Sequence, residues 1–128
     1  MDHPSSHSKR ILIIEDHEDS ALALGVFLRT LGHAVETAGT ATEGFDCARA
    51  RRPDVILSDI GLPDEDGLTL ARRVRANGTL QRVWLIALTA HPMCDETIDA
   101  GFDHFMRKPA DLEMLAALLR SLPPSRVV

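Results

Sequence analysis

The sequence predicts an α/β domain in which a five-stranded parallel sheet is covered by helices on both faces. Short apolar runs, typical of buried strands, alternate along the chain with stripes of apolar residues at helical spacing. Five such strand–helix repeats require parallel strands joined by crossover helices. With 128 residues, 45% of them hydrophobic, the chain has the size and the apolar content of one domain with a real core.

The first two repeats are well marked. Residues 10–15, RILIIE, form a continuous apolar run that indicates a strand buried on both faces. The helical stripe that follows stops at Gly32, a residue type favoured just beyond a helix end. Residues 34–38 are a short strand, and Thr40 with Glu43 has the spacing of a capping box that opens the second helix.

The third repeat carries the acidic stretch DVILSDIGLPDEDG, residues 54–67. Its first six residues are an apolar strand that ends on Asp59, and the next helix should end near Asn77. We expect the later acids of the stretch to be loop or solvated residues, with Asp66 capping the helix before Gly67. One carboxylate, that of Asp59, is therefore singled out by its place at a strand end.

The last two repeats are uneven. Residues 83–88, VWLIAL, are the most apolar strand, whereas residues 104–106, HFM, predict only a brief fifth strand. Between them, Pro92 and two β-branched residues lower helix propensity, so a fourth helix over 93–100 should be short or irregular. The final helix is expected to end at Pro123.

Composition excludes several classes of protein. A net charge of −5 argues against a nucleic-acid surface, and no apolar run approaches the roughly 20 residues of a membrane span. The first ten residues lack the apolar core of a signal peptide, so we expect a cytoplasmic protein. Cys47 and Cys94 lack CxxC spacing, so we expect two unpaired thiols. The expected division of the chain is an N-terminal tail, one domain, and a C-terminal tail or linker stub, at residues 1–8, 9–122 and 123–128.

Polar side chains follow four of the predicted strands. In a parallel sheet, ligands bind beyond the carboxyl ends of the strands. The residues just past these ends are Glu15, Asp16, Asp59, Thr89 and Lys108. They should therefore converge at one edge of the sheet.

The chemistry of this set indicates phosphoryl acceptance. At an effective dielectric of about 20, two carboxylates at about 4 Å repel by on the order of 4 kcal/mol, so the three acids need protons or a cation. Mg²⁺ is the cation that fits a few carboxylates best. Lys108 can pair with Asp59 or with a phosphoryl group, and Thr89 can donate its hydroxyl. A carboxylate nucleophile, a metal, an ammonium and a hydroxyl are the parts that phosphoryl transfer requires.

Each residue also has an ordinary interpretation. Asp59 alone would be a turn or capping residue, Thr89 a strand-end threonine and Lys108 a solvated charge. The acids of EDHED, residues 15–19, would be a solvated loop. The functional interpretation is favoured only because all of these residues fall at strand ends that the topology gathers.

The motifs ILIIEDHED, PDVILSDIGLPDEDG, ALTA and GFDHFMRKP together resemble those of the receiver domains of two-component response regulators, over about residues 9 to 122. The resemblance implies a flavodoxin-like sheet with strand order 2-1-3-4-5. The segments DIGLP and AGFDHFMRKP are most similar to receivers attached to hybrid histidine kinases. The family implies a signalling switch and phosphoacceptor, not an enzyme.

The resemblance also implies roles for the acids. Asp59 would accept a phosphoryl group from a phosphohistidine on a sensor histidine kinase or a histidine phosphotransfer protein. Asp16, Asp59 and the backbone carbonyl of Gly61 would hold Mg²⁺ directly, and Glu15 would act through water.

The remaining roles concern the response to phosphorylation. Thr89 and Lys108 would bind the phosphoryl oxygens, and Thr89 with Phe105 would form the switch toward a partner surface. The bond between Lys108 and Pro109 would be cis. Output would pass through a downstream protein partner or an effector domain outside this chain, with no direct contact to nucleic acid or membrane.

The chain departs from the family pattern at a few positions. Glu15 stands where Asp is commoner and should still support metal binding. Phe105 stands in place of Tyr and lacks a hydroxyl, so its ring is expected to stay mostly buried. His17 and His91 flank the site and are expected to be polar rim residues, with phospho-relay or metal ligation as the alternative. In the family, the residues at the positions of Gly61 and His91 tune the lifetime of the phosphoryl group.

Two other functions use similar residues. A haloacid-dehalogenase-type phosphohydrolase also uses an Asp nucleophile and Mg²⁺. Such an enzyme would carry the motif DxD after its first strand and would need a cap over its substrate. This chain has EDHED at that position and no insertion that could form a cap. A flavodoxin-like flavin carrier is excluded because an acidic loop after the first strand repels phosphate. A receiver that binds partners without phosphorylation would normally lack one of the key residues.

Overall fold

A computed structural model describes residues 8–90 and 99–126. The helices and strands alternate as the periodicity predicts, with bounds that differ by a few residues at most. In chain order they are β1 (Arg10–Ile14), α1 (Glu18–Thr30), β2 (Ala34–Ala38), α2 (Ala41–Arg51), β3 (Val55–Asp59), α3 (Gly67–Ala76), the 3-10 turn η1 (Gly78–Leu80), β4 (Trp84–Thr89), β5 (His104–Arg107) and α5 (Leu112–Ser121).

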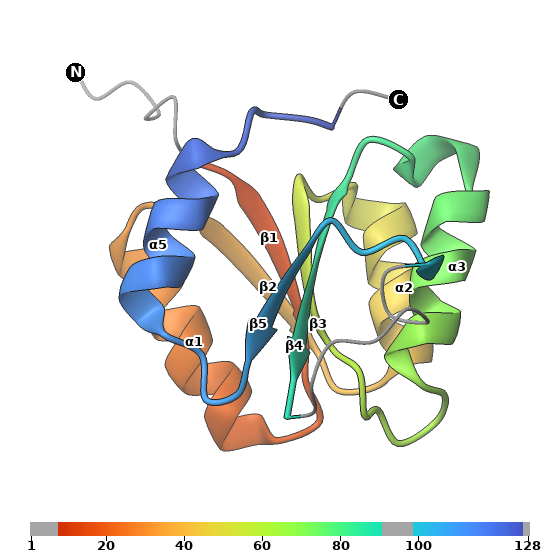
Figure 1. The fold of residues 1–128 in the computed structure, drawn as a ribbon, viewed down its shortest axis with the longest axis horizontal. Coiled ribbons are helices and arrows are strands. Elements are labelled where there is room, and N and C mark those ends of the chain that lie inside the picture. The colour runs from red at the N-terminus through yellow and green to blue at the C-terminus, as the bar shows by residue number, and fades with distance from the viewer. Residues whose placement is uncertain (1–7, 91–98, 127–128) are drawn as a thin grey trace.

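The strands form one parallel sheet in the order β2-β1-β3-β4-β5 (Figure 1). Helices α1 and α5 cover one face, and α2 and α3 cover the other (Figure 1). The predicted fold class and strand order are therefore confirmed. The short or irregular helix expected over 93–100 falls almost wholly on residues outside the described ranges, as does His91. No helix of the described part of the chain is long and apolar enough to cross a membrane.

The core has two aliphatic layers because successive side chains of a strand point to opposite faces. Ile11 and Ile13 of β1 pack toward α1 and α5, and Leu12 and Ile14 pack toward α2 and α3. All four are at most 2% exposed. Full burial of such a side chain contributes about 1.5–3 kcal/mol, so the central strands hold their carboxyl ends in fixed positions.

The predicted helix ends are confirmed. The Thr40 hydroxyl accepts a hydrogen bond from the Glu43 amide at 3.1 Å, and the Asp66 carboxylate accepts one from the Thr69 amide at 2.7 Å. The latter bond lowers the pKa of Asp66. Gly32 follows α1 with a φ of 95°, a conformation that L side chains rarely adopt.

Asp64 has a partner that its position in the sequence does not indicate. Its carboxylate accepts hydrogen bonds from the amides of Ala41 and Thr42, at 2.8 and 2.9 Å, and from the Thr42 hydroxyl at 2.8 Å. These bonds hold the pKa of Asp64 well below its usual range, and the bond from the Thr42 amide has the largest effect. Asp64 thus caps α2 and ties the loop after β3 to that helix.

His33 predicts a dependence of stability on pH. Its Nδ1 accepts the amide hydrogen of Lys9 at 3.0 Å and must be unprotonated to do so. Burial, reinforced by the Lys9 cation, lowers the pKa of His33. The folded state therefore binds fewer protons, and the contribution of His33 is complete above about pH 6.5 and lost as pH falls below it toward the folded-state pKa.

Urea unfolding above and below about pH 6.5 measures this effect. The free energy of unfolding of the wild type should decrease as the pH is lowered through this range. That of His33→Gln should change less. His17→Gln, at an exposed position before α1, is the control and should follow the wild type. Parallel profiles for wild type and His33→Gln would refute this role.

Candidate functional site

The carboxyl edge of the sheet brings together the side chains that the sequence singled out. Asp59 is the last residue of β3 and Thr89 the last of β4, while Glu15 and Lys108 directly follow β1 and β5. Glu15, Asp59 and Thr89 are buried, each at most 8% exposed. These residues meet because the parallel strands end at the same edge of the sheet. The pairing of β4 with β5 continues one residue further, where the Lys108 amide donates to the Thr89 carbonyl at 2.8 Å.

Lys108 joins two of the carboxylates. Its Nζ lies 2.7 Å from Oε1 of Glu15 and 2.9 Å from Oδ2 of Asp59. Burial is the largest single effect on the pKa of Lys108 and lowers it, but the hydrogen bonds and charges of Glu15 and Asp59 together raise it above its ordinary value. Lys108 is therefore an ammonium held over Asp59 at neutral pH.

Three carboxylates at this edge have the geometry of a cation site. Glu15, Asp16 and Asp59 each offer an oxygen, and these atoms all lie within 4.8 Å of one another. Oxygen ligands of this kind fit Mg²⁺. Both oxygens of Glu15 are already engaged, by Lys108 and by the His17 amide at 3.2 Å, whereas Asp16 is exposed. Asp16 is therefore the most exposed of the three carboxylates.

The loop after β3 supports Asp59 through its backbone. The Gly61 amide donates to Oδ1 of Asp59 at 3.1 Å. The Gly67 amide donates to the Ile60 carbonyl at 2.7 Å, and a Cβ at Gly67 would lie 2.5 Å from the Asp59 carbonyl oxygen. Gly67 is therefore a supporting residue of the site, whereas the sequence predicts only that it lies at the start of a helix. Its closeness to Asp59, eight residues earlier, depends on the tertiary structure.

Three further predicted features lie within the described residues. The bond between Lys108 and Pro109 is cis, as expected. The Phe105 ring was expected to be mostly buried; it is partly buried, packs against the core and lies 6.1 Å from Phe102 between ring centroids. Cys47 has no disulfide partner among the described residues.

A cleft of about 660 Å³ adjoins the site. Its walls come from α1, the end of β4 and the loop between β5 and α5, and include Glu15 and Lys108. Leu24, Leu88 and Leu112 make much of the lining apolar. The cleft thus places an apolar wall beside the Lys108 ammonium.

A parallel sheet of this strand order, with a lysine-bridged carboxylate cluster at its carboxyl edge, defines an α/β domain with a candidate cation site. Residues 11–120 match the family model of the response regulator receiver domain. The chain belongs to this family of two-component signalling domains, whose members are phosphoacceptors and not classical enzymes.

Curated relatives include transcriptional regulators. The chain is 34% identical over 116 residues to the transcriptional regulatory protein PhoP of Escherichia coli, covering 88% of this chain and 51% of that protein. It is 35% identical over 118 residues to the response regulator MprA of Mycobacterium tuberculosis, covering 90% and 50%. The chain spans about half the length of these relatives.

Solved structures give the same fold. The chemotaxis response regulator CheY4 of Vibrio cholerae matches with a TM-score of 0.83 and 26% identity, covering 90% of this chain and 99% of that one. The receiver domain of a sensor histidine kinase from Pseudomonas aeruginosa, with magnesium coordinated in its active site cleft, matches with a TM-score of 0.81 and 30% identity, covering 88% and 95%. Regulators and kinase receivers both match, so the narrower similarity to hybrid-kinase receivers stays a prediction.

Proposed function

We propose that this domain is a phosphorylatable switch of a two-component or phosphorelay system and that Asp59 is its phosphoacceptor. The observation that carries the proposal is the ammonium of Lys108 at 2.9 Å from Asp59, beside two further carboxylates at the carboxyl edge of the sheet. An oxygen of Asp59 attacks the phosphorus of a phosphohistidine, and the P–N bond breaks. The imidazole leaves with that electron pair and takes up a proton.

The carboxylates supply the second part of the proposal, a Mg²⁺ site. Asp16 and Asp59, with the carbonyl of Gly61, would hold the ion directly, and Glu15 would act through water. When bound, Mg²⁺ neutralises negative charge on the carboxylates and on the phosphoryl oxygens. The support for this assignment is the 4.8 Å clustering of the three carboxylates and the exposure of Asp16.

The response to phosphorylation would start from Thr89 and Lys108. Both bind the phosphoryl oxygens, and Lys108 exchanges its contact with the Asp59 carboxylate for one with the phosphoryl group. Phe105 lies on β5, three residues before Lys108, and changes its packing with that strand. The domain thus has two conformations close in free energy, and the phosphoryl group biases their populations.

The proposed partners follow from this chemistry. The phosphodonor is a sensor histidine kinase or a histidine phosphotransfer protein in the cytoplasm, and the apolar cleft beside Lys108 supports a protein donor. Output passes to a downstream protein partner or to an effector domain outside these residues. A phosphohydrolase and a phosphorylation-independent receiver are the alternatives. Asp59 with Lys108 argues against the second, and the lack of a cap-sized insertion argues against the first.

Incubation with Mg²⁺ and a small acyl phosphate tests the proposal. The chain should gain one phosphoryl group that is stable in acid and labile to hydroxylamine, as an acyl phosphate on Asp59 would be. Removal of Mg²⁺ with a chelator should prevent the gain. A chain that stays unmodified with Mg²⁺ and donor in excess would refute the proposed function.

Asp16→Asn tests the metal site separately. Loss of an anionic ligand should weaken Mg²⁺ binding on the order of tenfold, or about 1.4 kcal/mol, in a calorimetric titration. Asp19→Asn is the matched control, because Asp19 is exposed in the first turn of α1 and has no part in the cluster. Equal Mg²⁺ affinities for the two variants would remove Asp16 from the proposed ligand set.

A further inference from the structure

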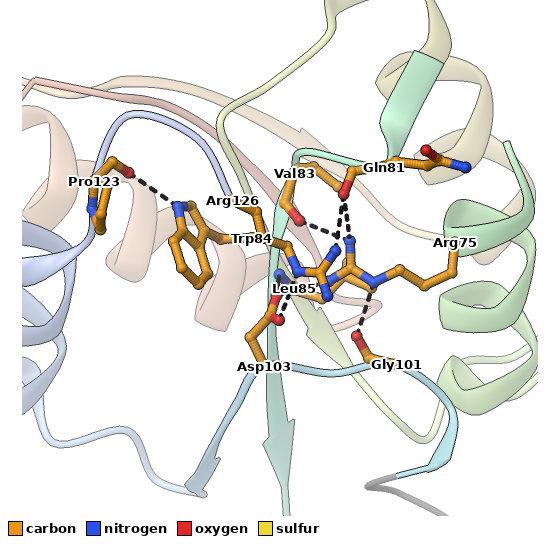
Figure 2. Close-up of polar contacts among 9 residues, drawn as sticks. All are labelled: Arg75, Gln81, Val83, Trp84, Leu85, Gly101, Asp103, Pro123 and Arg126. Atoms are coloured by element: carbon orange, nitrogen blue, oxygen red, sulfur yellow. Dashed lines mark hydrogen bonds and ion pairs between the residues drawn. The ribbon is translucent and has the colours of Figure 1, made fainter. Parts of the chain in front are cut away.

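The segment after α5 is docked along the end of the sheet opposite to the acidic site (Figures 1 and 2). Leu122 is buried with the core layer under α1 and α5. The Pro123 carbonyl accepts a hydrogen bond from the Trp84 indole at 2.9 Å. The Arg126 amide donates to the Arg82 carbonyl at 2.9 Å. The segment therefore follows a defined path over the start of β4 and the loop that precedes it.

Arg126 makes the most specific contacts of the segment. Its Nε donates to Oδ1 of Asp103 at 2.8 Å, and its Nη1 donates to the Gln81 carbonyl at 2.9 Å (Figure 2). The Arg126 and Asp103 side chains are 28% and 14% exposed. A charge-assisted bond in this partly buried position is stronger than an exposed ion pair, so the contact selects a guanidinium.

The receiving side is assembled by other residues of the domain. Oδ2 of Asp103 accepts hydrogen bonds from Arg75 at 2.6 Å and from the Leu85 amide at 2.9 Å. Arg75 also donates to the carbonyls of Gly101 and Val83, at 2.9 and 2.8 Å. Asp103 is thus oriented by α3 and β4, and its other oxygen is left for Arg126.

The Asp103 carboxylate pairs with two guanidinium groups, those of Arg75 and Arg126. Burial lowers the pKa of Arg75. The Asp103 carboxylate acts to raise this pKa, and the Arg126 cation lowers it further. One carboxylate therefore serves two cations. The second cation, Arg126, lies beyond α5, the last helix, and is not part of any helix or strand.

We propose that Trp84, Asp103 and the carbonyls of Gln81 and Arg82 form a recognition site for a short proline–arginine segment, which residues 123–126 occupy in cis. The ligand class is an extended peptide. Its proline carbonyl accepts a hydrogen bond from the Trp84 indole, and an arginine three residues later donates to the Asp103 carboxylate. The folded unit accordingly extends to Arg126, which lies at the end of the sheet away from Asp59 (Figures 1 and 2).

Trp84 is the one tryptophan of the chain, so its fluorescence reports directly on this site. Arg126→Ala in the full chain should shift the emission to longer wavelength and increase quenching by acrylamide. Hydrogen exchange of the amides of residues 122 and 126 should quicken on the order of tenfold, as expected for loss of a charge-assisted bond. Arg120→Ala, an exposed arginine in the last turn of α5, is the matched control and should behave as wild type.

A peptide distinguishes recognition from a general loosening of the fold. A synthetic peptide with the sequence of residues 121–126, added at about millimolar concentration to match the tethered segment, should restore low quenching to Arg126→Ala. The same peptide with alanine for arginine should not. Far-UV circular dichroism and exchange of the β3 amides serve as checks that the variant is folded.

Three results would overturn the proposal. The first is an Arg126→Ala chain with wild-type quenching and exchange. The second is equal restoration by the two peptides, which would show that Asp103 does not select arginine. The third is protection of residues 122–126 that grows with protein concentration, which would assign the bound segment to a second copy of the chain.

Discussion

Asp59→Asn is expected to abolish phosphoryl acceptance from both a small acyl phosphate and a phosphohistidine donor. The asparagine amide is close in size to the carboxylate but is a poor nucleophile and cannot form the acyl phosphate. The fold should survive, because Lys108 keeps its 2.7 Å contact with Glu15 and the apolar residues of β3 are unchanged. Mg²⁺ affinity should fall as well, since one of the three clustered carboxylates becomes neutral.

Intact-protein mass spectrometry after incubation with donor and Mg²⁺ measures this loss directly. Asp46→Asn is the matched control, because Asp46 is exposed on α2 and pairs only with Arg49 among the described residues. It should accept one phosphoryl group as the wild type does. A hydroxylamine-labile phosphoryl group on the Asp59→Asn chain would place the acceptor at another residue and contradict the assignment.

Gly67→Ala is expected to destabilise the domain and to impair the site at the same time. The added Cβ would lie 2.5 Å from the Asp59 carbonyl oxygen and 2.8 Å from Cα of Ile60. Both are backbone atoms, so no side-chain rotation relieves the contact, and α3 or the end of β3 must move. Overpacking costs about 1–3 kcal/mol, against a helix-propensity gain of at most about 1 kcal/mol.

Urea unfolding should therefore show a net loss of about 1–2 kcal/mol for Gly67→Ala. The rate of phosphorylation by a small donor should also fall, because Asp59 shifts relative to Lys108. Gly78→Ala is the control, since a Cβ at Gly78 meets nothing within 4 Å. Equal stabilities and phosphorylation rates for the two variants would show that the backbone of α3 does not hold Asp59 in place.

Most of the fold could be predicted because it depends on local periodicity. Residues 11–14 of β1, 55–57 of β3 and 84–88 of β4 are apolar throughout, as expected of parallel strands buried on both faces. The caps at Thr40 and Asp66 depend on residues three positions apart, and both were predicted. The residues that converge at the site followed from one topological rule, that parallel strands end at the same edge.

The parts that could not be predicted involve partners far apart in sequence. Asp64 caps a helix that begins 23 residues earlier, and no local pattern distinguishes it from the neighbouring acids. The contact of Lys108 with Glu15, 93 residues away, shows how one ammonium serves two carboxylates. The residues interpreted as a C-terminal tail or linker stub carry Arg126, whose partner Asp103 is 23 residues away.

By itself, the sequence determined the succession of strands and helices, their parallel arrangement and the edge at which Asp59 would meet Glu15, Asp16, Thr89 and Lys108. These follow from the spacing of apolar residues and from rules that hold for any sheet of this kind. The tertiary structure alone decided which atoms bond at that edge, how closely α3 approaches β3, and where the segment after α5 lies. Such contacts depend on distances of a few ångströms between packed elements, which periodicity along the chain does not specify.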